Sequence, residues 1–131
     1  MIRSRGRLSR SEDFTRVYRS GRSVANKYLV LYYFERSEPG MADAGGPRVG
    51  FSVSKRLGTA VERNRIKRIL REAFHAHGES LRGNMDLVLI ARGPLVELLE
   101  TGGLAAVKEK MTEVFRKGAL VSPREDRRAS S

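Results

Sequence analysis

Residues 60–76 combine an apolar stripe of helical spacing with a basic remainder, and this pattern constrains the fold more than any other feature. The stripe recurs at i, i+3, i+4, i+7 and i+8 and consists of Ile66, Ile69, Leu70, Ala73 and Phe74. Such spacing is typical of an amphipathic helix with one face in a core. Thr59 and Glu62 fit a capping box at its start, and we expect the helix to reach about His77.

Periodicity predicts the other elements. We expect helices over 10–20 and 104–117 and strands over 28–34, 48–54 and 86–91. In the strand over 28–34, alternation sends Tyr28, Val30, Tyr32 and Phe34 to one face and Leu29, Leu31 and Tyr33 to the other. In the strand over 48–54, one face is apolar and the other is small and polar. The sequence therefore predicts an α+β sandwich in the order α-β-β-α-β-α, in which one further strand has no clear pattern.

The chain has the length of one domain. Its 131 residues favour a single RNA-binding domain over 9–118, between a flexible basic arm over 1–8 and a flexible tail over 119–131. Residues 35–47 are turn formers and charged residues, which indicates a loop. The chain contains no Cys and no apolar stretch of membrane-spanning length, so we expect a cytoplasmic protein without a membrane partner.

Positive charge is concentrated in two blocks. The net charge is +11, and 20 of the 26 basic residues are Arg, the side chain suited to bidentate phosphate binding. Residues 1–22 carry a net +5 and residues 48–75 a net +6, while the rest of the chain is nearly balanced. This distribution points to a polyanionic partner.

The helix over 60–76 carries much of the second block. On a helical wheel, Asn64, Arg68, Arg71 and His75 lie opposite the apolar stripe, and Arg65 and Lys67 flank it. A run of charge is often only a solvated face, but such faces usually interleave acids and bases at i, i+4. Here like charges accumulate, which favours nucleic-acid binding.

The segment RVGFSVSKRLGTAVERNRIKRILREAF, residues 48–74, resembles the signature region of the bacterial ribonuclease P protein component. Residues 11–33 and the strand end at Ile90-Ala91-Arg92 are similar to the same family, whereas the 35–47 loop and the Leu95–Gly103 segment look longer or richer in Gly. The resemblance implies an α-β sandwich with a four-stranded sheet, the order α-β-β-β-α-β-α and a left-handed βαβ crossover.

The resemblance also implies a role. The chain would be the protein subunit of ribonuclease P, an endoribonuclease that removes the 5′ leader of precursor tRNA, with the catalytic groups and the Mg²⁺ ions on the RNA subunit. Its partners would be the catalytic RNA and precursor tRNA, and no protein partner is required. On this chain we expect no catalytic and no metal-binding residue, because its only histidines, His75 and His77, have no acidic partners in the sequence.

Two binding sites follow from the resemblance. The helix motif would contact the RNA subunit, with two further cations just before the helix: Arg63, Asn64, Arg65, Lys67, Arg68 and Arg71, with Lys55 and Arg56. The family's cleft for the single-stranded leader would use stacking aromatic, small and basic side chains: Phe14, Tyr18, Tyr28, Val30, Tyr32, Ser52, Ser54 and Arg10. We assign Phe51 and Tyr33 to the core.

Two other functions fit the composition. A ribosomal or assembly protein that binds structured RNA without an enzyme would show no preference for precursor over mature tRNA. A stand-alone metal-dependent nuclease would cleave without added RNA, but acids near the basic residues are few: Glu12, Asp13, Glu62 and Glu72.

Overall fold

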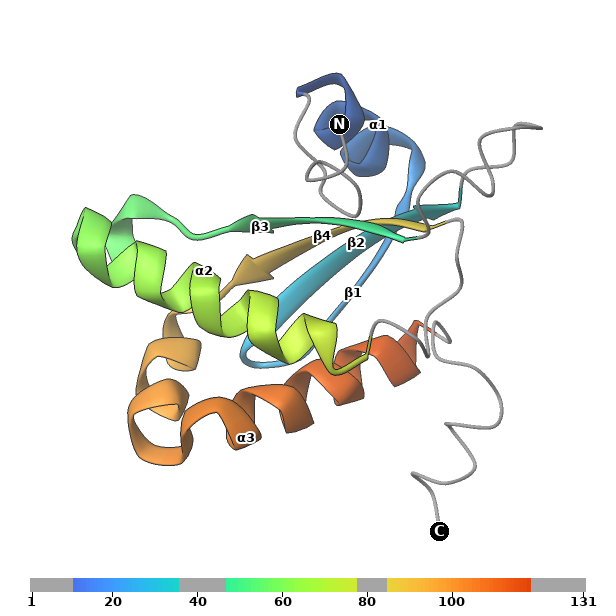
Figure 1. Cartoon of the computed structure of the whole chain (residues 1–131). Helices are drawn as coiled ribbons and strands as arrows, with labels where there is room; N and C mark the ends of the chain where they lie inside the picture. Colours follow the sequence, from blue (N-terminus) through green and yellow to red (C-terminus); the bar gives the residue numbers. More distant parts are fainter. Residues whose placement is uncertain (1–10, 36–46, 78–84, 119–131) are drawn as a thin grey trace, which may run out of the picture.

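A four-stranded sheet in the order β1-β2-β4-β3 separates helices on its two faces (Figure 1). The structure is a computed structural model that describes residues 11–35, 47–77 and 85–118. In chain order its elements are α1 (Ser11–Ser20), β1 (Arg22–Ala25), β2 (Leu29–Glu35), β3 (Arg48–Ser52), the 3-10 turn η2 (Lys55–Leu57), α2 (Ala60–His75), β4 (Met85–Ala91) and α3 (Gly93–Lys117). This order is the one that the family resemblance implied, and β1 is the strand that had no clear pattern.

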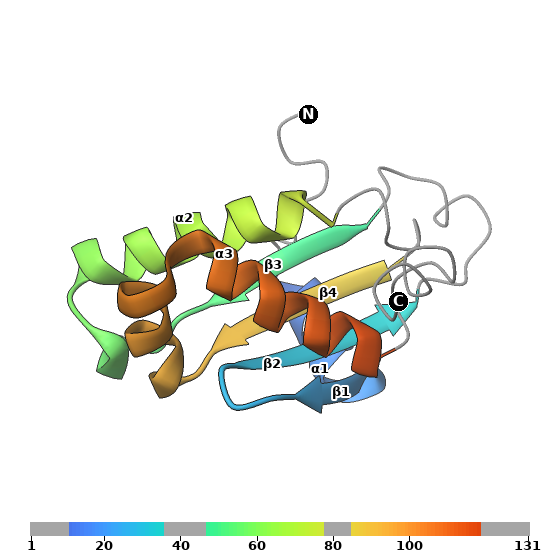
Figure 2. The ribbon, with the colours of Figure 1, turned by 90° about the horizontal axis from the view of Figure 1, so that it is seen from below.

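β4 is a central strand, antiparallel to β2 and parallel to β3. Six of its seven residues are buried, as expected for a strand covered on both faces. α2 connects the parallel strands β3 and β4. Figure 2 shows the sheet from the side of α2. When this view is rotated in its plane until the β3 and β4 arrows point upward, β4 lies to the left of β3. This is the left-handed crossover that the resemblance implied, an uncommon sense for parallel strands.

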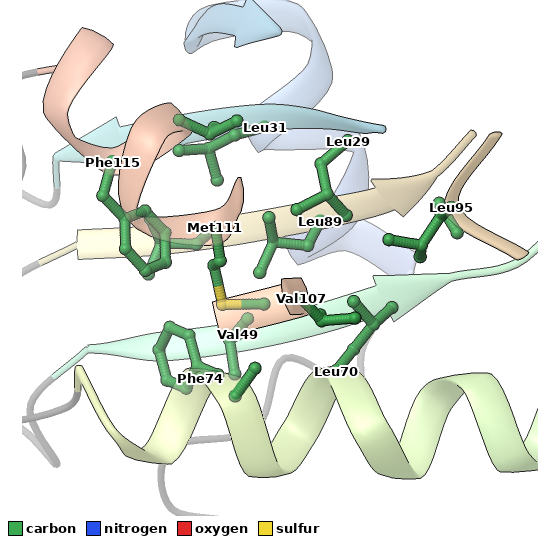
Figure 3. Close-up of a cluster of buried hydrophobic side chains, with 14 of the residues drawn as sticks. Leu29, Leu31, Val49, Leu70, Phe74, Leu89, Leu95, Val107, Met111 and Phe115 are labelled. Atoms are coloured by element: carbon green, nitrogen blue, oxygen red, sulfur yellow. The ribbon is translucent and has the colours of Figure 1, made fainter. Parts of the chain in front are cut away.

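The main core lies between the sheet and the layer formed by α2 and α3 (Figure 3). The predicted stripe of α2 is confirmed, because Ile66, Leu70, Ala73 and Phe74 are buried and Ile69 is partly buried against the same core. The Phe74 ring meets the Phe115 ring of α3 edge-on, with centroids 6.1 Å apart. This contact joins the two helices of the layer.

A smaller cluster lies on the other face of the sheet, beneath α1. Val17 of α1 and Val88 of β4 are fully buried there, flanked by Phe14, Tyr32, Phe34 and Ile90. The predicted alternation of β3 is confirmed, since Val49, Phe51 and Val53 belong to the main core and the residues between them face the other way. Tyr33 also lies against the main core, as expected.

A buried ion pair links β3 to β4 on the α1 face. Arg48 and Asp86 are opposite one another in the parallel ladder, and the guanidinium donates two hydrogen bonds to the carboxylate, Nε–Oδ1 at 2.9 Å and Nη2–Oδ2 at 2.7 Å. The Asp86 side chain has no exposed surface. Arg48 Nη2 also lies 3.7 Å from Oδ1 of Asp13 in α1. The hydrogen bonds to Asp86 raise the pKa of Arg48 above its ordinary value, although burial opposes the shift.

The boundaries of most elements agree with prediction to within two residues, but α3 differs. It begins at Gly93, and the non-helical Gly103 (φ +63°, ψ −156°) divides it, so the predicted helix over 104–117 is its second part and the part over 93–102 was missed. The sequence did contain a sign of this first part of α3: Pro94 is typical of the first turn of a helix, and the buried Leu95 and Leu99 follow it at helical spacing. The two glycines before Leu104 obscured it, because glycine usually marks the end of a helix.

Several expectations fall on residues that the structure does not describe. The basic arm over 1–8, the tail over 119–131, nearly all of the 35–47 loop and Arg10 lie outside the described ranges. Within those ranges, no helix is long and apolar enough to cross a membrane.

We predict that Arg48→Met lowers the free energy of unfolding by about 3 kcal/mol, because the buried Asp86 carboxylate loses its bidentate partner. Arg48→Lys keeps the positive charge but not the two-pronged geometry, so its loss should be smaller. Urea denaturation at neutral pH measures both variants. Equal stability of Arg48→Met and the unmodified chain would contradict the importance assigned to this pair.

Candidate nucleic-acid interfaces

The first candidate interface is the basic surface of α2 and η2. It consists of the eight residues predicted for the RNA-subunit contact: Lys55, Arg56, Arg63, Asn64, Arg65, Lys67, Arg68 and Arg71. Lys55 and Arg56 lie in η2, which two residues separate from α2. The structure therefore places all eight residues on two consecutive helical segments. We call this set the α2 basic surface.

The start of α2 is fixed by the predicted capping box. The Thr59 hydroxyl accepts a hydrogen bond from the Glu62 backbone N–H at 3.2 Å, and the Thr59 N–H donates to the Glu62 carboxylate at 2.7 Å. Gly58 precedes the cap with φ of +152°, and a Cβ there would lie 2.5 Å from a Glu62 carboxylate oxygen. The Arg63 Nε donates to the Gly58 carbonyl at 3.3 Å. These contacts hold the turn between η2 and α2.

The side chains of the α2 basic surface differ in exposure. Asn64 and Arg68 are exposed, as the helical wheel predicted, and so is Arg65, which the wheel placed beside the stripe. Arg71, which the wheel placed opposite the stripe, is half-buried, as are Arg63 and Lys67. Arg71 leans toward the sheet, with its guanidinium carbon 5.9 Å from the centre of the Phe51 ring on β3. The basic surface therefore extends from the outer side of α2 toward the edge strand β3.

The positive charge of α2 is not neutralised within the described part of the chain. The ion pairs among the described residues join Arg16 to Asp13, Arg48 to Asp13 and to Asp86, and Lys110 to Glu113. None of these pairs involves a cation of α2 or η2. Glu62 is occupied by the capping box. Uncompensated guanidinium groups on one helix are suited to phosphate binding, with release of counterions.

The second candidate interface lies on the other face of the sheet and is aromatic. The Tyr18 ring of α1 meets the Tyr32 ring of β2 edge-on at 5.0 Å, and Phe14 lies 6.4 Å from Tyr18. Tyr18 keeps 42% of its surface exposed. Burial, and then the neighbouring Tyr32, raise the pKa of Tyr18, so its phenol keeps its proton at neutral pH. Phe14, Tyr18 and Tyr32 form what we call the aromatic surface.

Small side chains extend this face toward β3. α1 packs against β2 and β4. Gly50 and Ser52 of β3 share the strand face of Arg48, and Ser52 is paired with Ile90 of β4, itself only half-buried. Ile90 in turn pairs with Val30 of β2, which is also half-buried. Ser54 follows, exposed, with its hydroxyl accepting from the Arg56 N–H at 3.2 Å.

Tyr28 is not on this face, so the predicted alternation is wrong at that residue. It precedes β2 in a turn where the Asn26 carboxamide oxygen accepts from the N–H groups of Tyr28 and Leu29, both at 2.9 Å. The Asn26 amide donates to the Lys110 carbonyl of α3 at 3.0 Å, which draws the turn toward α3. The Tyr28 ring lies against the main core with Lys27 and Lys110 at 5.8 and 5.7 Å from its centre.

Sequence reasoning also missed what holds α1 in place. Asp13 was considered only as an acid near the basic residues, but it is nearly buried and faces Arg48. The signal was available in part, because Asp86 is the one charged residue in an otherwise apolar strand and Arg48 begins the neighbouring strand. The pairing could not be read without the strand order.

The two histidines lie near the C-terminal end of α2. His75 is exposed, and His77 Nε2 lies 3.0 Å from the Thr112 hydroxyl, while its ring meets Phe115 edge-on at 5.3 Å. In the ranges that the structure describes, no group of three or more His, Cys, Asp or Glu side chains could hold a metal ion.

Comparison with known proteins gives consistent matches. The family model described as Ribonuclease P matches residues 2–118. The ribonuclease P protein component of Bacillus pumilus is 37% identical over 119 residues, which cover 91% of this chain and 92% of that protein. The solved structure of the Staphylococcus aureus RNase P protein superposes with a TM-score of 0.76 at 32% identity, covering 89% of this chain and 98% of the other. For the RNase P protein from Thermotoga maritima the TM-score is 0.73 at 30% identity, with coverage of 85% and 96%.

Proposed function

Because this chain belongs to the ribonuclease P protein family and has the role of protein subunit of that ribonucleoprotein, we propose how it acts there. Its α2 basic surface binds the catalytic RNA, and its aromatic surface binds the single-stranded 5′ leader of precursor tRNA. The observation that carries the proposal is the placement of the two surfaces on opposite sides of one sheet, each with chemistry suited to a different form of RNA.

The α2 basic surface suits a folded RNA. Its cations project from a capped helix anchored in the main core, so their spacing is fixed before the RNA arrives. Arg side chains fit phosphates bidentately, and the exposed Asn64 between Arg63 and Arg65 can donate to and accept from sugar or base edges. Binding through such contacts depends on salt, because each neutralised phosphate releases counterions.

The aromatic surface suits a single strand. Unpaired bases expose their faces and stack on aromatic side chains at about 1–3 kcal/mol per base, with little dependence on sequence. Phe14, Tyr18 and Tyr32 offer partly exposed rings, and the small Ser52 side chain leaves room for a backbone beside them. A leader of variable sequence needs a surface of this kind, and a duplex cannot use it. This supports recognition of precursor over mature tRNA.

The hydrolysis itself belongs to the RNA subunit in this proposal. That RNA would hold the Mg²⁺ ions, which activate water and stabilise charge on the phosphate when bound. The described residues of this chain bring together no set of side chains that fits a metal ion. Its own contribution is to hold the leader and so keep the cleavage site of the precursor in one place, which lowers the entropic cost of reaching the transition state.

The proposal is tested with precursor tRNA at low Mg²⁺, incubated with a bacterial ribonuclease P RNA alone, with this chain alone and with both. Cleavage at the mature 5′ end only in the combined reaction is the expected result. If the chain leaves cleavage by the RNA unchanged, the alternative of a non-enzymatic structured-RNA-binding protein gains support. Cleavage by the chain alone would instead make its carboxylates candidate metal ligands.

Arg68→Ala should weaken binding to the catalytic RNA and reduce the slope of log K against log[salt] by about one, the value for one lost phosphate contact. Arg22→Ala is the matched control, because this exposed Arg lies in β1, away from α2. Titrations at several salt concentrations give both slopes. An unchanged slope for Arg68→Ala, or the same reduction for Arg22→Ala, would move the RNA-subunit contact away from α2.

For the aromatic surface, Tyr32→Leu should lower affinity of the assembled enzyme for precursor tRNA by about fivefold or more, through loss of a stacking partner. Affinity for mature tRNA should stay the same. Tyr33→Leu is the control, because Tyr33 is the next residue of β2 and lies against the main core on the opposite face. Equal losses for precursor and mature tRNA in Tyr32→Leu would count against leader binding at this surface.

A further inference from the structure

The attachment of α1 to the sheet is uneven along the helix. Its C-terminal half is held on the sheet by Val17 against Val88 and by the Tyr18–Tyr32 ring contact, and its last turn is closed by the Gly21 N–H, which donates to the Val17 carbonyl at 3.0 Å. At Gly21 the chain passes so close to β2 that a Cβ would lie 2.4 Å from the Tyr33 carbonyl oxygen. This end of α1 therefore cannot shift without disturbing the sheet.

The N-terminal half has one ionic contact with the sheet among the described residues, and it is made by Asp13. Only 7% of Asp13 is exposed, although it lies in the first turn of the helix. Its Oδ1 lies 3.3 Å from Arg16 Nη1 in the same helix and 3.7 Å from Arg48 Nη2 at the start of β3. Arg48 cannot follow a moving Asp13, because two hydrogen bonds hold its guanidinium on the buried Asp86.

Asp13 therefore links the N-terminal half of α1 to a fixed cation at the start of β3. Its neighbour Phe14 is a member of the aromatic surface, and the small residues Gly50 and Ser52 follow Arg48 along the same strand face. The Asp13–Arg48 contact thus sets how far Phe14 lies from β3. The sheet side of this distance is held by the Arg48–Asp86 pair, while the helix side is held by the packing of Phe14 beside Val17 and Val88 and by the Asp13 carboxylate.

We propose that Asp13 is a positioning residue for the leader: through Arg48 it fixes the N-terminal half of α1 and so the separation between Phe14 and β3 in which the single strand lies. This rests on the proposed function of the aromatic surface. Asp13 does not contact the leader in this proposal, and as an acid it would repel phosphates. Its loss should therefore reduce leader recognition although the chain becomes more positive.

The test compares Asp13→Ala with Glu12→Ala in the assembled enzyme. Both variants remove one carboxylate from the first turn of α1, so they change the net charge and the helix dipole interaction alike, but Glu12 is exposed and makes no ion pair among the described residues. The readout is the ratio of affinities for precursor and mature tRNA. For Asp13→Ala we expect this ratio to fall by about fivefold, equivalent to much of one stacking contact. For Glu12→Ala it should not change.

One further variant and the affinity for the catalytic RNA make the outcome decisive. Asp13→Asn keeps the shape of the side chain and a partly negative oxygen facing Arg48 but loses the full charge, so it should recover part of the ratio. Affinity for the catalytic RNA should be the same in all Asp13 and Glu12 variants. The inference is overturned if Asp13→Ala and Glu12→Ala behave alike, or if Asp13→Ala weakens binding of the catalytic RNA as much as that of the leader. If Tyr32→Leu lowers the ratio and Asp13→Ala does not, only the positioning role fails; if neither lowers it, leader binding at this surface fails as well.

Discussion

The parallel contact between β3 and β4 is the constraint on which the other parts of this structure depend. The bidentate pair of Arg48 and Asp86 determines which residues of the two strands lie opposite one another. Because side chains alternate along a strand, a shift by one residue would either turn Asp86 of β4 into the main core or turn the apolar residues of β3 out of it. Removing a charge from water costs several kcal/mol unless it is paired, so such a shift is strongly disfavoured.

That pairing also determines where α2 lies. A helix that connects two adjacent parallel strands must cover one face of them, and α2 does so with its buried stripe. Burying a large apolar side chain contributes about 1.5–3 kcal/mol, whereas repulsion between neighbouring cations on a helix costs a few tenths. The stripe of Ile66, Leu70 and Phe74 therefore decides the orientation of α2, and the crowded Arg side chains follow it to the outside. The α2 basic surface results from the packing of the opposite side of the helix.

The sequence was informative where one pattern was strong and local. The stripe and capping box of α2, and the alternation of Val49, Phe51 and Val53, were read correctly because each pattern depends only on helix or strand geometry. Tyr28 was assigned to the wrong face because the Asn26 side chain holds it in a turn, and strand alternation does not apply there. The first part of α3 was missed because two glycines precede the predicted start, and the non-helical Gly103 divides α3 into two helical parts. The contact of Asp13 with Arg48 joins residues far apart in the chain, and no local pattern predicts it.

β3 lies between the two candidate interfaces. On one side, Phe51 lies beneath the Arg71 guanidinium and against Phe74, so it supports the α2 basic surface. The next residue, Ser52, faces the other way, toward the side of the sheet that carries the aromatic surface. Successive residues of a strand are separated by about 3.3 Å, and β3 is held by its ladder to β4. The two interfaces are thus related by one short, rigid strand. In the proposed function, a strand of this kind would hold the leader at a constant distance and angle from the RNA on the opposite side, which two surfaces joined by a loop could not do.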